Sequence, residues 1–135
     1  MRTSLVGVAL ILVPVFLTPT ATAQPTALHL ELLAPEVIRP GDRVSLRLVV
    51  TPAGEEAMLI TPTSEGAAVV VARGRLQRRD GAVDGDSLVV QVPIIAQHAG
   101  HALVRVHVET YACEGERCRA IEADTSVALD VVRAP

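Results

Sequence analysis

The sequence predicts an all-β protein: a seven-stranded, antiparallel, immunoglobulin-like β-sandwich preceded by a signal peptide. Apolar and polar residues alternate with a period of two, and turns rich in Gly and Pro separate the alternating runs at regular spacing. No segment shows the 3.6-residue period of an amphipathic helix. The apolar fraction of 50% is too high for a disordered chain, and 135 residues suit one domain.

The N-terminus has the features of a secretory signal peptide covering residues 1–23. One arginine supplies the positive charge, Leu5–Leu17 is uncharged and apolar, and Ala21-Thr22-Ala23 fits the small-residue cleavage rule. The alternative is an uncleaved membrane anchor, but a span needs about 20 apolar residues and a proline interrupts this run. We therefore expect cleavage after Ala23 and a single sandwich domain over residues 24–135, located in the periplasm or secreted.

The first four predicted strands follow the N-terminal segment and are separated by Pro- and Gly-containing turns. They cover residues 28–33, 44–51, 57–61 and 68–76. The second shows the alternation most clearly: Leu46, Leu48 and Val50 point to one face, whereas Ser45 and Arg47 point to the other. One face of such a strand packs into a core and the other meets solvent.

The last three predicted strands cover residues 88–95, 101–112 and 121–132. A charged segment with two Asp-Gly dipeptides, residues 78–86, precedes them and is predicted to be a loop. Pro93 lies inside the first of the three and suggests a sheet edge or a bulge, because proline cannot donate a ladder hydrogen bond. The second has the longest alternation, with Val104, Val106 and Val108 on its apolar face.

The two cysteines, Cys113 and Cys118, flank a turn-like segment between the last two predicted strands. Two cysteines in an exported chain usually pair, so we predict a disulfide across a hairpin tip. A six-residue loop corresponds to roughly 2 kcal/mol of chain entropy, so the bridge would shape the tip more than it stabilises the core. A structural staple, a redox-active pair and part of a metal site all stay open, and the staple is favoured because most secreted disulfides are structural.

The motif Tyr111-Ala112-Cys113 followed by Cys118 resembles the tip of the immunoglobulin-like periplasmic domain of the transmembrane thiol–disulfide reductase family (DsbD). The resemblance implies that Cys113 and Cys118 form a redox pair that passes reducing equivalents to thioredoxin-like proteins, with Tyr111 beside it. The spacer between the cysteines is shorter than is typical of that family. Tyr111 is also the only aromatic residue after the signal peptide, so no Phe or Trp can cap the pair.

Composition narrows the function to a small set of classes. A net charge of −3 and one Tyr with one Phe argue against nucleic-acid binding. We predict an exported, non-catalytic binding or scaffolding module with a protein partner, no cofactor, no catalytic residue and no membrane span after cleavage. The alternative is a thiol–disulfide exchange module using Cys113 and Cys118, whose partner would be thioredoxin-like. A metal carrier is a third class.

Two polar groups carry weaker signals. Histidines near the start of the long strand are expected to be surface residues rather than metal ligands: His98, His101 and His107. Four arginines are expected to form a solvated cluster, or alternatively a docking surface for an acidic partner: Arg73, Arg75, Arg78 and Arg79.

Overall fold

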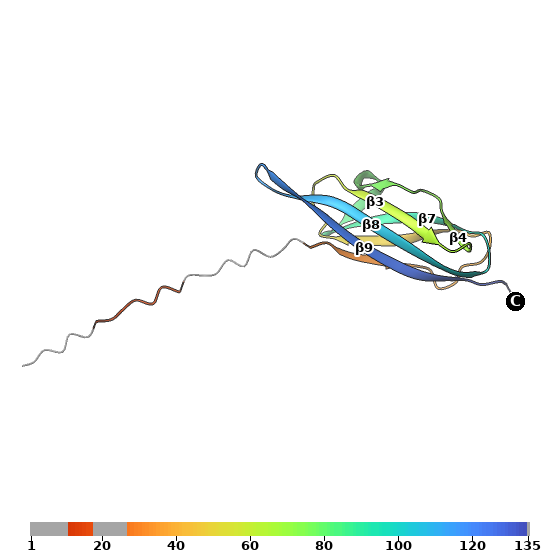
Figure 1. The fold of residues 1–135 in the computed structure, drawn as a ribbon, viewed down its shortest axis with the longest axis horizontal. Helices are drawn as coiled ribbons and strands as arrows, with labels where there is room; N and C mark the ends of the chain where they lie inside the picture. The colour runs from red at the N-terminus through yellow and green to blue at the C-terminus, as the bar shows by residue number, and fades with distance from the viewer. Residues whose placement is uncertain (1–10, 18–26, 135) are drawn as a thin grey trace, which may run out of the picture.

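The computed structural model describes residues 11–17 and 27–134, and the second of these ranges folds into two antiparallel sheets packed face to face (Figure 1). The strands are β1 (His29–Leu33), β2 (Arg43–Thr51), β3 (Leu59–Glu65), β4 (Val69–Val71), β5 (Leu76–Gln77), β6 (Gly81–Asp84), β7 (Ser87–Ala96), β8 (Gly100–Glu114) and β9 (Arg117–Val131). A single turn of 3-10 helix, η1 (Arg78–Asp80), precedes β6, and the described residues contain no α-helix.

The strand order is that of an immunoglobulin-like sandwich, which confirms the predicted fold class. The first sheet runs β1-β2-β7, and both β4 and β6 pair with the far side of β7. The second sheet runs β5-β3-β8-β9. Strands β2 to β6 therefore alternate between the two sheets along the chain.

The core lies between the sheets and is built from aliphatic side chains, because the inward positions of the central strands are almost all Val, Leu or Ile. Six residues predicted to face inward are completely buried: Leu46, Leu48, Val50, Val104, Val106 and Val108. Thr110 is the only polar residue of the described part that is buried, and its hydroxyl donates a hydrogen bond to the carbonyl oxygen of Ala57 at 2.9 Å. That bond ties β8 to the segment leading into β3.

The predicted strand over residues 68–76 is wrong, because this segment crosses from one sheet to the other. Its first part is β4 in the first sheet and its last part is β5 in the second. Val69 and Leu76 are each 1% exposed, although their spacing of seven would put them on opposite faces of one straight strand. Both can be buried only because the chain turns between them.

The predicted loop over residues 78–86 is also partly wrong, since it contains η1 and β6. β6 pairs with β7 from Gly81↔Val90 to Asp84↔Ser87, so the second Asp-Gly dipeptide lies at the hairpin turn between them. Nine strands therefore occur in the described residues, where seven were predicted.

β7 is an interior strand, so Pro93 does not mark a sheet edge as predicted. β6 covers one part of its outer side, Ser87–Val90, and β4 covers another, Ile94–Ala96. Pro93 falls in the gap between these two neighbours, and its carbonyl accepts a hydrogen bond from the Ala72 amide at 2.9 Å. The missing proline N–H therefore interrupts neither short ladder.

The predicted signal peptide lies mostly outside the described residues, as does its cleavage site at Ala23. Within it, residues 11–17 have no regular secondary structure, and their apolar side chains are exposed rather than packed in the core. Across the described ranges, no helix is long and apolar enough to cross a membrane.

Candidate functional site

The β8–β9 hairpin projects beyond the rest of the second sheet (Figure 1). β3 pairs with β8 only as far as Glu109, whereas the pairing of β8 with β9 continues to Glu114↔Arg117. The last pairs, from Thr110↔Ile121 onward, therefore form a two-stranded ribbon with no third strand in their sheet. An isolated two-stranded ribbon is only marginally stable, so this one needs an additional constraint.

A tight turn closes the ribbon. Gly115 and Glu116 are its two central residues, and Gly115 has φ of 60°. A positive φ at the first central position is typical of a type II′ turn, which suits the twist of a hairpin. Glu114 and Arg117 belong to the strands, so the turn is shorter than the segment predicted from the sequence.

The predicted disulfide closes the tip immediately behind this turn. Cys113 and Cys118 are directly opposite each other, with Cα atoms 4.0 Å apart, and the described residues contain no free cysteine. Such a short Cα separation fits a non-hydrogen-bonded pair of an antiparallel ladder. Cys113 is half-buried and Cys118 is exposed.

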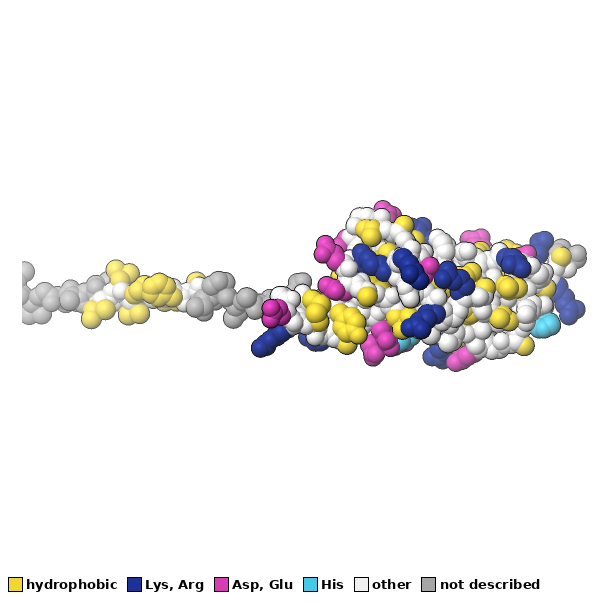
Figure 2. All heavy atoms as spheres, turned by 90° about the horizontal axis from the view of Figure 1, so that it is seen from above, with side chains coloured by type: hydrophobic (Ala, Val, Ile, Leu, Met, Phe, Trp, Pro, Cys, Tyr) yellow, Lys and Arg dark blue, Asp and Glu magenta, His cyan; other side chains and the backbone are white. Residues whose placement is uncertain are grey.

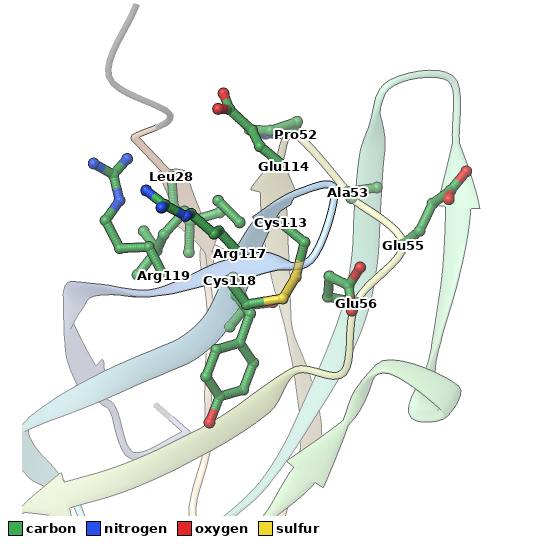
Figure 3. Close-up of a pocket in the computed structure, with 15 residues that line it drawn as sticks. Leu28, Pro52, Ala53, Glu55, Glu56, Cys113, Glu114, Arg117, Cys118 and Arg119 are labelled. Carbon is green, nitrogen blue, oxygen red and sulfur yellow. A yellow bond between two sulfur atoms is a disulfide. The ribbon is translucent and has the colours of Figure 1, made fainter.

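The ribbon has two different faces, because side chains alternate along each arm. One face carries the disulfide together with Tyr111, which is 55% exposed and lies opposite Ala120. The other carries Arg117 and Arg119, and Figure 3 shows these two arginines on the side of the hairpin away from the bridge. Tyr111 therefore lies beside the pair on the same face of the ribbon.

A groove of about 890 Å³ separates the hairpin from the loop between β2 and β3 (Figure 3). The loop contributes Pro52, Glu55 and Glu56, and the hairpin contributes the disulfide and both tip arginines. The groove therefore carries charges of both signs next to apolar surface. Such a lining suits a polypeptide segment better than a small apolar ligand.

The predicted arginine cluster lies on the neighbouring edge of the sandwich. Figure 2 looks down on this edge and shows basic side chains gathered next to apolar ones. Arg75, Arg78 and Arg79 line a second groove of about 690 Å³, which also reaches Tyr111. Arg78 donates a hydrogen bond to the carbonyl oxygen of Ala53, so part of this cluster serves to hold the β2–β3 loop.

Asp80 neutralises another part of the cluster. Its carboxylate accepts a hydrogen bond from the Gln77 amide at 2.8 Å and contacts the Arg73 guanidinium at 3.3 Å. The backbone hydrogen bond, aided by Arg73, lowers the pKa of the Asp80 carboxyl below its ordinary value of 3.8. Arg73 and Arg78 are therefore engaged within the domain, by Asp80 and by the Ala53 carbonyl. Arg75 and Arg79 line the groove and could contact an acidic partner.

Three histidines, His98, His101 and His107, lie at the opposite end of the hairpin from its tip or midway along it. His98 is in the turn between β7 and β8, and His101 contacts Asp130 across the ladder. His107 is surrounded by acidic side chains: its Nδ1 lies 2.7 Å from Asp124, and its Nε2 lies 3.1 Å from Glu109 and 3.9 Å from Glu122.

The hydrogen bond to Asp124 is the main reason why the pKa of His107 is raised above its ordinary value of 6.5; partial burial opposes this and Glu109 adds to it. Sequence reasoning missed these carboxylates because they come from different strands. The positions of the two cysteines could have revealed them, because a disulfide across the hairpin fixes the register of β8 against β9. Stepping back along both arms from the Cys113–Cys118 pair brings Glu109 opposite Glu122, and then His107 opposite Asp124.

Comparisons with known proteins support the fold. No protein-family model and no curated protein sequence matches the chain. Among solved structures, it resembles part of native alpha-2-macroglobulin from Escherichia coli, in a structure spanning domain MG7 to the C-terminus, with 17% identity and a TM-score of 0.59. The match covers 79% of this chain and only 17% of that one.

A second structure is the ASH/PapD-like domain 7 of human CEP192, with 12% identity, a TM-score of 0.47, and coverage of 93% of this chain and 99% of that domain. The first likeness shows a shared fold, and the chain is thus a disulfide-bonded, immunoglobulin-like β-sandwich.

Proposed function

We propose that this chain is an exported β-sandwich that binds a protein partner, without catalysis, through the disulfide-closed tip of the β8–β9 hairpin. The main observation behind this proposal is that the tip projects beyond the end of β3. A two-stranded ribbon gains nothing for the core by extending past β3, yet here it is extended and fixed by the chain's only disulfide. A pre-formed projecting tip loses little conformational entropy on binding.

The surface of the tip supports a protein as the partner. Tyr111 is a large, exposed, amphipathic side chain, and tyrosine is enriched at protein interfaces. Beside it the groove carries Glu55 and Glu56, while Arg117 and Arg119 lie on the other face of the ribbon. A partner segment that wraps the tip would be selected by charges complementary to both groups.

The compartment belongs to the same proposal. A structural disulfide persists where the environment is oxidising, and the apolar leader of residues 1–23 supplies a route of export. We therefore place the protein in the periplasm or outside the cell, cleaved after Ala23. Mass spectrometry of the exported protein tests this part, because a mature N-terminus at Gln24 is expected and an intact leader would contradict it.

Site-specific photo-crosslinking tests the binding surface. A photoreactive amino acid replaces Glu116 at the tip in one variant and Gln97, in the turn at the far end of the sandwich, in a matched control; both residues are exposed. In cells of the source organism, we expect a discrete crosslinked protein from the tip position and none from the control. Tyr111→Ala should weaken that crosslink. Equal crosslinking from both positions, or none from the tip, would contradict the proposal.

One observation favours a second candidate, thiol–disulfide exchange through Cys113 and Cys118. Cys118 is exposed, so the thiolate of a thioredoxin-like protein could reach its sulfur atom, as the resemblance to the DsbD family implies. Equilibration with glutathione decides between the two candidates. Exchange requires a reduction potential of roughly −200 mV, whereas a structural bridge lies below about −300 mV.

A further inference from the structure

Outside the hairpin tip, the strongest concentration of chemical groups is on the outer face of the second sheet. His107, Glu109, Glu122 and Asp124 lie together there, and we call them the His107 cluster. The Nε2 atom of His107 and one oxygen of each glutamate lie within 4.8 Å of one another. These three groups are exposed or half-buried, so an ion could reach them from solvent.

The ladder places two like charges directly opposite each other in this cluster. Glu109 of β8 pairs with Glu122 of β9, and such like-charged cross-strand pairs are destabilising. The cations nearest this pair are His107 on the same face and the arginines that share the second groove with Glu109. β3 brings Leu59 opposite Glu109 and Thr61 opposite His107, and β9 is the last strand of its sheet.

The imidazole is held with its second nitrogen facing this pair. Asp124 accepts a hydrogen bond from Nδ1 of His107 at 2.7 Å, which favours the tautomer with a proton on Nδ1. Nε2 faces the two carboxylates and lies 3.1 Å from Glu109, to which it donates a hydrogen bond when the ring is doubly protonated. Once that proton is released, the lone pair of Nε2 and the two carboxylates present three acceptors to an ion. A carboxylate behind a histidine is the usual support of a histidine that ligates a metal.

We propose that His107 Nε2 and the carboxylates of Glu109 and Glu122 bind a divalent transition-metal cation of the Zn²⁺ class, with Asp124 as the positioning residue for the imidazole. An imidazole with two carboxylates suits zinc, and water completes the coordination. This inference revises the expectation that His107 is only a surface residue. It is independent of the function proposed for the tip.

The geometry requires only small side-chain movements. Zinc–ligand bonds of about 2.0–2.2 Å place the ligand atoms of a tetrahedral site roughly 3.3–3.5 Å apart. The Nε2 atom of His107 is 3.1 Å from Glu109 and 3.9 Å from Glu122, so Glu122 must approach the ring by about half an ångström. The two glutamate oxygens lie within 4.8 Å of each other and must close by up to about 1.5 Å. The Glu122 side chain is 61% exposed and is free to do so.

His101 provides a matched control on the same face of the same two strands. It also contacts an aspartate, Asp130, across the ladder. Its side chain is 91% exposed, against 34% for His107, and no second carboxylate contacts it among the described residues. A general attraction of cations to an acidic surface would use both histidines, whereas the proposed site uses only one.

The test is calorimetric titration of the untagged, oxidised, chelator-treated protein with Zn²⁺ at about pH 8, where an imidazole is largely neutral. The disulfide keeps both thiols out of the competition. We expect one ion per chain, no detectable binding in His107→Gln, and at least tenfold weaker binding in Glu122→Gln and in Asp124→Asn. His101→Gln should bind like the wild type.

Thermal stability gives a second readout that a purely structural role would not produce. Zn²⁺ should raise the melting temperature of the wild type but not that of Glu122→Gln, whereas metal-free Glu122→Gln should be at least as stable as the metal-free wild type. Absence of Zn²⁺ binding, equal losses in His101→Gln and His107→Gln, or equal binding of Ca²⁺ that survives His107→Gln would each overturn the proposal.

Discussion

Removing the disulfide tests whether it acts locally. Cys113→Ser/Cys118→Ser opens a closed loop of six residues at the end of the two-stranded ribbon. The chain-entropy model gives a cost of about 2 kcal/mol in the free energy of unfolding. For a domain of this size the entropy of unfolding is about 0.23 kcal/mol per kelvin, so the melting temperature should fall by about 9 °C.

That value is an upper limit, because the opened ribbon can fray while the sandwich stays folded. Every disordered tip residue regains conformational entropy in the native state, which reduces the measured loss. The core lies on the other side of Thr110 and contains no cysteine. We therefore expect cooperative unfolding with nearly native core packing.

Urea denaturation measures the loss of global stability, and hydrogen exchange measures the local fraying of the tip. Amides from Tyr111 to Ile121 should lose their protection, whereas those of Val104, Val106 and Val108 should keep theirs up to the global stability. Wild-type protein treated with a reductant is the control, since it opens the bridge without changing a side chain. A loss above about 4 kcal/mol, or full protection at the tip, would refute the local role.

Three further predictions concern the scaffold. Gly81→Ala should cost about 1–3 kcal/mol, because its Cβ would lie 2.8 Å from a carbonyl oxygen of β7; Gly74→Ala, with nothing within 4 Å, should leave urea stability unchanged or slightly raised. Thr110→Val should cost about 1–3 kcal/mol by leaving a carbonyl without its donor, and a cost near zero would show that water replaces the hydroxyl. Asp80→Asn should lower the melting temperature at neutral pH. Because the folded state lowers the pKa of this carboxyl below 3.8, its contribution is lost as pH falls, and the two proteins should converge near pH 2.

The sequence predicted the fold class because the core is made of long alternating strands. In β2 and β8 the apolar positions keep one phase, and all of their central inward residues are buried. The segment from Val69 to Leu76 could not be resolved in the same way. Its apolar residues pack from two different sheets, and a local pattern does not reveal where the chain crosses from one sheet to the other.

Of the two candidate sites, the disulfide could be predicted from local sequence and the His107 cluster could not. The disulfide could be predicted because two cysteines allow one pairing, and its position at a hairpin tip followed from its place between two strands. The surroundings of His107 depend on which residues of β9 face β8, and a shift of one residue would send Asp124 and Glu122 to the opposite face of the sheet. Register of this kind is fixed by long-range pairing rather than by local composition.

The tip and the His107 cluster share one hairpin, yet different interactions hold them. His107 and Glu109 lie in the part of β8 that also pairs with β3, so their register is fixed on both sides of the strand. The tip has pairing on one side only and depends on the covalent bridge. Opening the disulfide should therefore loosen the proposed binding surface and leave the opposition of Glu109 and Glu122 intact. The same two strands thus hold a tip that depends on the bridge and the His107 cluster that does not, because the third strand ends between them.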